Sequence, residues 1–145
     1  MEDQYNLVRF VTAQDSDGTY RRALAELRSG SKRSHWMWFV FPQIAGLGRS
    51  PMATTYAVSS LAEAQAYWRH PVLGPRLSES AHSVCAVQGR TAVQIFGAVD
   101  AKKFHSSVTL FLRADPQEPV FREALNQYFD GVPDAVTDQR LGLHG

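Results

Sequence analysis

The stretch "KRSHWMWFVFPQ", residues 32–43, sets two cations and a histidine before an apolar run that ends at a proline. The run holds two tryptophans and two phenylalanines, side chains that dominate protein cores. As a strand or as a helix it would be apolar on both sides, so it must lie inside the protein. Because no partner strand is evident in the rest of the sequence, we predict a short buried helix that is capped by Ser34 and stops before Pro42.

Helical periodicity continues on both sides of this run. Before it, apolar residues recur at helical spacing from Tyr20 to Leu27, and Gly30 is placed to end that helix. After it, the pair His70-Pro71 predicts a boundary between two helices, since proline disfavours helical geometry in the residue before it.

Two further signals lie in the second half of the chain. Thr91 and Gly97 are placed to cap and close a helical turn or two at "TAVQIFG". Asp100 is expected to cap a stronger helix, whose apolar residues run from Phe104 to Leu112 at spacings of three and four.

The length and composition of the chain are consistent with a single folded domain. A chain of 145 residues is long enough for one domain with a real core, and its 44% hydrophobic and 11% aromatic content excludes a disordered chain. No internal repeat or linker interrupts it. We therefore predict a mainly α fold, a compact single-domain bundle of about six to seven short helices over residues 1–145, with an irregular C-terminal tail from about residue 132.

Charge and cysteine content narrow the class of protein. A net charge of +1 argues against a strongly basic nucleic-acid binder, and the cations between Arg21 and Arg33 are interpreted as a solvated helix face. The single cysteine, Cys85, excludes an intramolecular disulfide framework and suits a reducing compartment. No apolar run has the length of a membrane span, and the first residues do not read as a secretory signal. We expect a soluble cytoplasmic protein that binds neither membrane nor nucleic acid, and its oligomeric state stays open.

Three blocks of the sequence resemble the signature blocks of a bacterial family of unknown function that is often labelled calpastatin. They are "KRSHWMWFVFPQIAGLGRS" (32–50), "YAVSSLAEAQAYWRHPVLGPRL" (56–77) and "IFGAVDAKKFHSSVTLF" (95–111). The resemblance runs from Leu7 to about Thr137, and the family includes a mycobacterial member of known structure. It implies a compact, mainly helical domain and no established activity. Trp68 and Phe104 depart from the family pattern, which has aliphatic residues there, but both keep an apolar side chain.

The calpastatin label does not fit the physical character of this chain. Calpain-inhibiting calpastatin domains are disordered polar segments that fold on their target. This chain instead carries eight phenylalanines, five tyrosines and three tryptophans, arranged along amphipathic helices. We therefore give calpain inhibition no weight.

Two residues are candidates for catalysis. His35 could act as an acid or a base near neutral pH. A ring that is hydrogen-bonded to a backbone carbonyl at a helix start explains this histidine equally well. Asp100 could act as a base in a hydrolysis, although a helix cap paired with Lys103 is its simpler interpretation.

Aromatic, cationic and amide side chains in the same blocks predict a binding pocket. The turn "GLGRS" offers backbone amides, an arginine and a hydroxyl to an anion, although a tight glycine turn also explains it. No histidine or cysteine spacing predicts a metal site, and no cofactor is expected. The predicted ligand-binding residues are Trp36, Trp38, Gln43, Arg49, Ser50, Tyr56, Arg76 and Lys103.

Two functional hypotheses follow from different classes of protein. The first is a pocket for a small anionic ligand, nucleotide-like or a sugar phosphate, with or without hydrolysis. The alternative is a non-catalytic protein-interaction or structural module with the same helical core. If His35, Arg49, Arg76 and Asp100 share one cleft, the first hypothesis gains support. If each is capped or paired separately, the second does.

Overall fold

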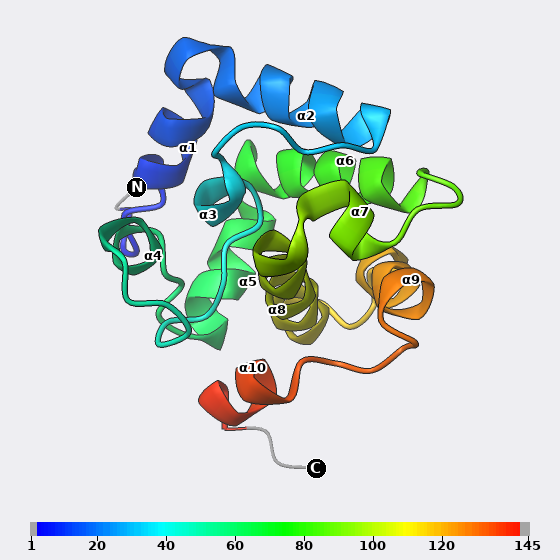
Figure 1. The fold of residues 1–145 in the computed structure, drawn as a ribbon. Helices are drawn as coiled ribbons and strands as arrows, with labels where there is room; N and C mark the ends of the chain where they lie inside the picture. The colour runs from blue at the N-terminus through cyan, green and yellow to red at the C-terminus, as the bar shows by residue number, and fades with distance from the viewer. Residues whose placement is uncertain (1–2, 143–145) are drawn as a thin grey trace.

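The computed structural model describes residues 3–142, which form ten α-helices and one 3-10 turn (Figure 1). The helices are α1 (Val8–Asp15), α2 (Thr19–Ser29), α3 (Met37–Val40), α4 (Pro51–Thr55), α5 (Leu61–Arg69), α6 (Leu73–Cys85), α7 (Ala92–Phe96), α8 (Ala98–Ala114), α9 (Pro119–Tyr128) and α10 (Ala135–Arg140). Six of them have eight residues or more, and the other four have four to six. The mainly α fold is confirmed.

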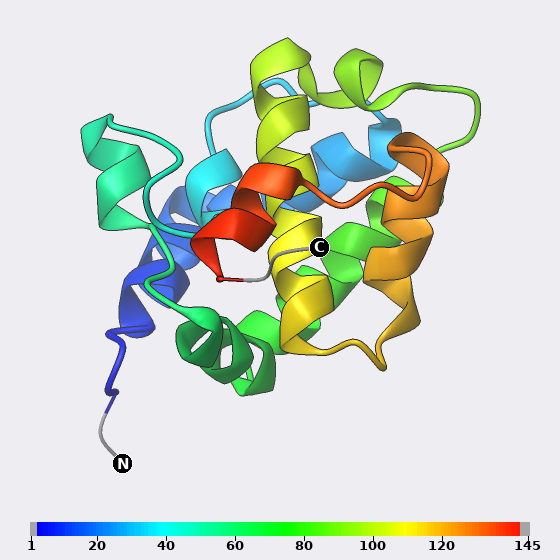
Figure 2. The ribbon, with the colours of Figure 1, turned by 90° about the horizontal axis from the view of Figure 1, so that it is seen from below.

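Helix α8 is the central element of the bundle. It is the longest helix, and nine of its 17 residues are buried. Helices α5, α7, α9 and α10 pack directly against it, and α6 joins α5 and α9 to α2. Figures 1 and 2 show α8 running through the middle of the molecule, with the C-terminal α10 lying across one side of it. Helix α8 therefore brings the C-terminal α10 and the mid-chain α5 together in one bundle.

The run of residues 32–43 supplies the aromatic centre of the core. Trp36 and Phe41 are fully buried, and Phe41 meets Phe104 of α8 edge to face at a centroid distance of 5.0 Å. Phe104 also stacks on Phe96 at 4.8 Å. The prediction that this run is buried is correct, but its helix, α3, is a single turn. Ser34 does not cap it, because α3 begins at Met37 and the Ser34 hydroxyl donates to Glu26 instead.

Short-range sequence signals located several helix ends correctly. Thr91 and Gln94 form a reciprocal capping box at the start of α7, and Gly30 ends α2 in a left-handed conformation, with φ of 74°. His70 separates α5 from α6, and its Nδ1 accepts hydrogen bonds from the backbone N–H groups of Val72 and Leu73. Each of these signals acts within a few residues of chain.

Two other parts of the chain differ from the sequence prediction. Asp100 does not cap α8, because the helix begins at Ala98 and Asp100 lies in its first turn, where it forms ion pairs. The segment predicted to be irregular from about residue 132 contains α10. Asp134 caps α10 by accepting a hydrogen bond from the backbone N–H of Thr137. Within residues 3–142, no helix combines the length and apolar character that crossing a membrane requires.

Candidate functional site

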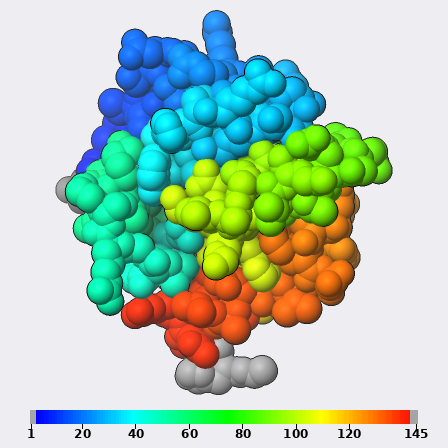
Figure 3. All heavy atoms as spheres, viewed as in Figure 1, coloured from blue at the N-terminus to red at the C-terminus, as the bar shows by residue number. Residues whose placement is uncertain are grey.

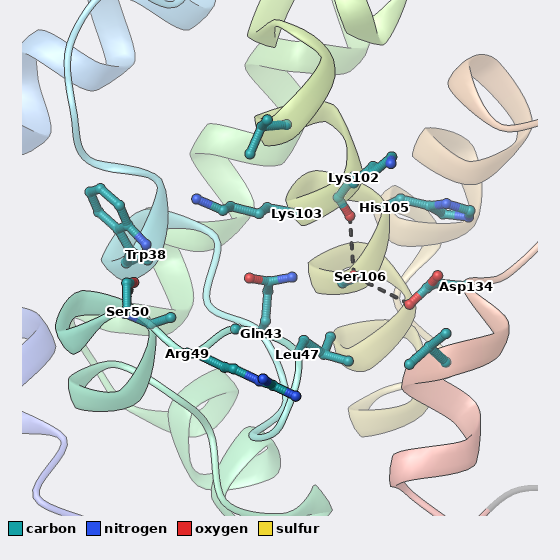
Figure 4. A pocket seen from close by; sticks show the side chains of 14 residues that line it. Trp38, Gln43, Leu47, Arg49, Ser50, Lys102, Lys103, His105, Ser106 and Asp134 are labelled. Atoms are coloured by element: carbon teal, nitrogen blue, oxygen red, sulfur yellow. Dashed lines mark hydrogen bonds between the residues drawn. The ribbon is translucent and has the colours of Figure 1, made fainter.

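A cleft of about 760 Å³ lies where three separate parts of the chain meet. One wall comes from α3, the loop after it and the start of α4, another from the first turns of α8, and the third from α10 and the residue before it. Figure 3 shows these three segments meeting on one face, and Figure 4 shows the side chains between them. The lining residues are Trp38, Gln43, Leu47, Gly48, Arg49, Ser50, Ala53, Val99, Lys102, Lys103, His105, Ser106, Asp134 and Val136.

The loop wall is held in place by backbone pairing. Val58 donates to the carbonyl of Gln43 at 2.8 Å, and the Val58 carbonyl accepts from Ala45 at 2.8 Å, which forms a short parallel bridge. The Gln43 amide side chain is directed into the cleft (Figure 4) and has no hydrogen-bond partner within residues 3–142. Ser50 caps α4 through a 3.1 Å bond from the backbone N–H of Ala53. The amide of Gln43 is thus available at a fixed point of the wall.

Lys103 crosses the cleft toward Trp38 and is held there from two sides. Its ammonium lies 4.7 Å from the centre of the Trp38 ring and 3.4 Å from Oδ1 of Asp100. A cation over an aromatic face is attracted by the ring quadrupole. The other carboxylate oxygen of Asp100 lies 2.8 Å from the ammonium of Lys32. Asp100 therefore holds a lysine on each side, and Lys103 is the one that lines the cleft.

The third wall is built around Asp134. Its Oδ2 accepts hydrogen bonds from the Ser106 hydroxyl at 3.2 Å, the Thr137 hydroxyl at 2.6 Å and the Thr137 backbone N–H at 3.1 Å. The backbone N–H of Asp134 donates to the Thr109 hydroxyl at 2.9 Å. Asp138 also binds the Arg113 guanidinium through two 2.9 Å bonds. These contacts fix α10 on α8.

His105 lies at the edge of the cleft, but its ring is engaged elsewhere. The imidazole stacks on Phe129 with a centroid distance of 4.1 Å, and its Nε2 donates to the Val132 carbonyl at 2.7 Å. Both contacts hold the segment between α9 and α10 against α8. The ring therefore anchors this segment next to the cleft.

The segment that precedes α3 is anchored by Glu26. One carboxylate oxygen accepts bonds from the backbone N–H groups of Arg33 and Ser34 and from the Trp36 indole at 2.9 Å, and the other accepts from the Ser34 hydroxyl. Desolvation by burial raises the pKa of Glu26, but these hydrogen bonds outweigh it and lower that pKa to about 2. Glu26 thus fixes the chain between Lys32 and α3.

Five of the predicted ligand-binding residues line the cleft together. They are Trp38, Gln43, Arg49, Ser50 and Lys103. Arg49 is exposed, and its guanidinium has no partner within residues 3–142. Whether these residues bind a ligand stays a prediction.

The other predicted site residues lie elsewhere. Trp36 belongs to the core, and Tyr56 packs on Phe10 and Phe39 behind the loop wall. Arg76 lies on α6, where it pairs with Asp15 at 2.8 Å.

Neither predicted catalytic residue lines the cleft. His35 is exposed in the loop before α3, and its ring has no hydrogen bond to any residue of the described range. Asp100 lies in the first turn of α8, where both of its carboxylate oxygens are paired with lysines. The four residues His35, Arg49, Arg76 and Asp100 therefore do not share one cleft, so the criterion that would have supported the pocket hypothesis is not met by this set of residues.

Sequence reasoning missed four polar lining residues: Lys102, His105, Ser106 and Asp134. The Asp-x-x-Thr spacing from Asp134 to Thr137 is a helix-start signal that could have located α10. Among the residues that the structure describes, no group of three or more His, Cys, Asp or Glu side chains is arranged to hold a metal ion.

Comparisons with known proteins extend over nearly the whole chain. A family model described as a protein of unknown function (DUF1810) matches residues 4–141. The crystal structure of the conserved hypothetical protein Rv1873 from Mycobacterium tuberculosis is similar, with 49% sequence identity and a TM-score of 0.94 over 98% of this chain and 100% of that one. No curated protein matches.

Proposed function

This chain belongs to the DUF1810 family of proteins of unknown function. We propose from its geometry that it binds a small phosphate-bearing ligand, nucleotide-like or a sugar phosphate, in the cleft beside α8. The observation that carries the proposal is the set of cations around one hollow: Arg49 from the loop, with Lys102 and Lys103 from α8. Asp134 is the one carboxylate among the lining residues. Positive charge that exceeds negative charge in a partly enclosed cleft attracts anions.

The remaining lining groups suit a ligand that is larger than a phosphate ion. The volume of about 760 Å³ falls within the roughly 300–1,000 Å³ of typical small-molecule sites. The half-buried indole of Trp38 offers an apolar face, and the Gln43 amide offers both a donor and an acceptor. A ligand whose phosphate lies at Arg49 and Lys103 could pack its organic part against Trp38 and hydrogen-bond to the Gln43 amide.

Hydrolysis has less support than binding. A general base must lie within hydrogen-bond reach of the proton that it removes. Asp100 lies behind Lys103, with both oxygens engaged, and His35 does not line the cleft. We assign Asp100 a positioning role, because its carboxylate holds the Lys103 ammonium at the cleft wall.

Titration calorimetry with ribose 5-phosphate and AMP, at low and high salt, tests the proposal. We expect binding that weakens as salt screens the charges. Arg49→Gln and Lys103→Gln should each weaken binding about tenfold, which corresponds to about 1.4 kcal/mol. Arg122→Gln removes an exposed cation from α9, outside the cleft, and serves as the matched control. If neither ligand binds the unmodified protein, the proposal is wrong.

The alternative function is a protein-interaction module, and one observation favours it. Val93 and Val99 are 55% and 67% exposed at the start of α7 and α8. Because Val93 does not line the cleft, Val93→Ser would weaken a partner contact there and leave phosphate binding unchanged. The two functions are thereby separable in the same protein.

A further inference from the structure

Within residues 3–142, only one oxygen of the Asp134 carboxylate accepts hydrogen bonds. Its Oδ2 accepts three hydrogen bonds, two from Thr137 and one from Ser106. Its Oδ1 accepts none from any residue in the range 3–142, although Asp134 lines the cleft. An ionised carboxylate can only accept hydrogen bonds, so this oxygen is suited to a donor on the ligand.

The carboxylate is held in this position from several directions. Asp134 is the N-cap of α10, and its own backbone N–H donates to Thr109 on α8. Arg113 of α8 binds Asp138 through two hydrogen bonds one turn further along α10. Figure 4 shows Asp134 facing α8 beside Ser106, across the cleft from Trp38 and Arg49. Asp134 and Arg49 therefore lie on different walls of one cavity.

The charges around the cleft indicate which donor fits. A second anionic group of a ligand would be repelled by Asp134. An ammonium group would share the cleft with Arg49, Lys102 and Lys103, and like charges in one cleft disfavour binding. A hydroxyl donates a hydrogen bond to the carboxylate without bringing a charge.

We propose that Asp134 is a specificity-determining residue that recognises hydroxyl groups, so that the cleft selects phosphorylated sugars over phosphates that lack hydroxyls. This inference rests on the proposed function, in which the phosphate lies at Arg49 and Lys103. The Gln43 amide, which has no partner within residues 3–142, is a second group available to the sugar. Sites that hydrogen-bond a substrate hydroxyl discriminate strongly against analogues that lack it.

Calorimetry with two matched ligands tests this selection in the unmodified protein. Ribose 5-phosphate and n-pentyl phosphate have the same number of carbons and the same phosphate charge, but only the first carries hydroxyls. We expect ribose 5-phosphate to bind at least about tenfold more tightly. Equal affinities would overturn the hydroxyl inference and leave the phosphate site standing, and absence of binding by both would overturn both proposals.

The variant Asp134→Asn assigns the selection to this residue. Asparagine is an equally good helix cap and keeps an oxygen acceptor for Ser106 and Thr137, so α10 should stay folded, which circular dichroism checks. The preference for ribose 5-phosphate should fall to about threefold or less, while n-pentyl phosphate binds as before or slightly more tightly. Arg122→Gln, which removes an exposed cation outside the cleft, should keep the preference. An unchanged preference in Asp134→Asn would overturn the assignment.

Discussion

The ammonium of Lys32 lies 2.8 Å from Oδ2 of Asp100, which joins the loop before α3 to the first turn of α8. Lys32 is only 7% exposed in its side chain, and its ammonium also lies 5.0 Å from the centre of the Trp36 ring. The same carboxylate reaches Lys103 at the cleft wall through its other oxygen. One aspartate thus links the aromatic core to the candidate site.

The variant Asp100→Asn should destabilise the protein. It leaves the buried ammonium of Lys32 without a negative partner, so we expect the free energy of unfolding to fall by about 1–3 kcal/mol. Urea denaturation at pH 7 measures this change. Asp130→Asn is the control, because Asp130 is exposed, has a positive φ that asparagine tolerates and forms no ion pair among the described residues. A loss in Asp100→Asn no larger than in this control would contradict the structural role of the pair.

The hydrogen bonds to Glu26 predict a dependence of stability on acid. Because they lower the pKa of Glu26 from its ordinary 4.5 to about 2, their charge-dependent contribution is complete above about pH 5 and is lost as pH falls toward 2. Glu26→Gln should therefore lower the free energy of unfolding by about 1–2 kcal/mol at pH 7. The difference in free energy of unfolding between Glu26→Gln and the unmodified protein should become smaller as pH falls from 5 to 2.

Urea titrations at several pH values follow this narrowing. The matched control is Glu123→Gln, on the exposed side of α9. If the difference in free energy of unfolding between Glu26→Gln and the unmodified protein stays constant down to pH 2, the charge of the Glu26 carboxylate does not contribute to stability.

Trp38 gives a direct optical test of the site. A ligand that packs on its indole should change tryptophan fluorescence, and Trp38→Phe should abolish that change while keeping an aromatic wall, so that affinity falls only about threefold. Trp68→Phe is the control, because the Trp68 indole bonds to Asp115 instead of lining the cleft. Survival of the signal in Trp38→Phe would place the ligand somewhere else.

The ion pair of Arg113 with Asp138 predicts the local stability of α10. The guanidinium makes two parallel 2.9 Å bonds, and lysine can replace only one of them. Arg113→Lys should lower the opening free energy of α10 by about 1 kcal/mol, so that its backbone amides exchange about fivefold faster. Hydrogen exchange measures this rate, with Arg122→Lys as the control. Unchanged exchange would mean that the capping by Asp134 alone holds α10.

The sequence by itself determined the helical character and several helix boundaries. The signals at Gly30, Thr91, Gly97 and His70 act through contacts within a few residues, so their identity is sufficient to locate the boundary. The aromatic run at residues 32–43 was predictable as core, since no surface could accommodate it. The resemblance of three blocks to one family was also readable without coordinates.

Only the tertiary structure decided which polar residues meet. Lys103 and Asp134 line one cleft because α10 packs on α8, and no local pattern encodes that packing. Asp100 looked like a helix cap, but its partner Lys32 comes from a distant segment. Arg76, predicted for the same site, lies on α6 and pairs with Asp15. Local hydrogen bonds fix where helices begin and end, whereas the site depends on side chains that packing brings together from far along the chain.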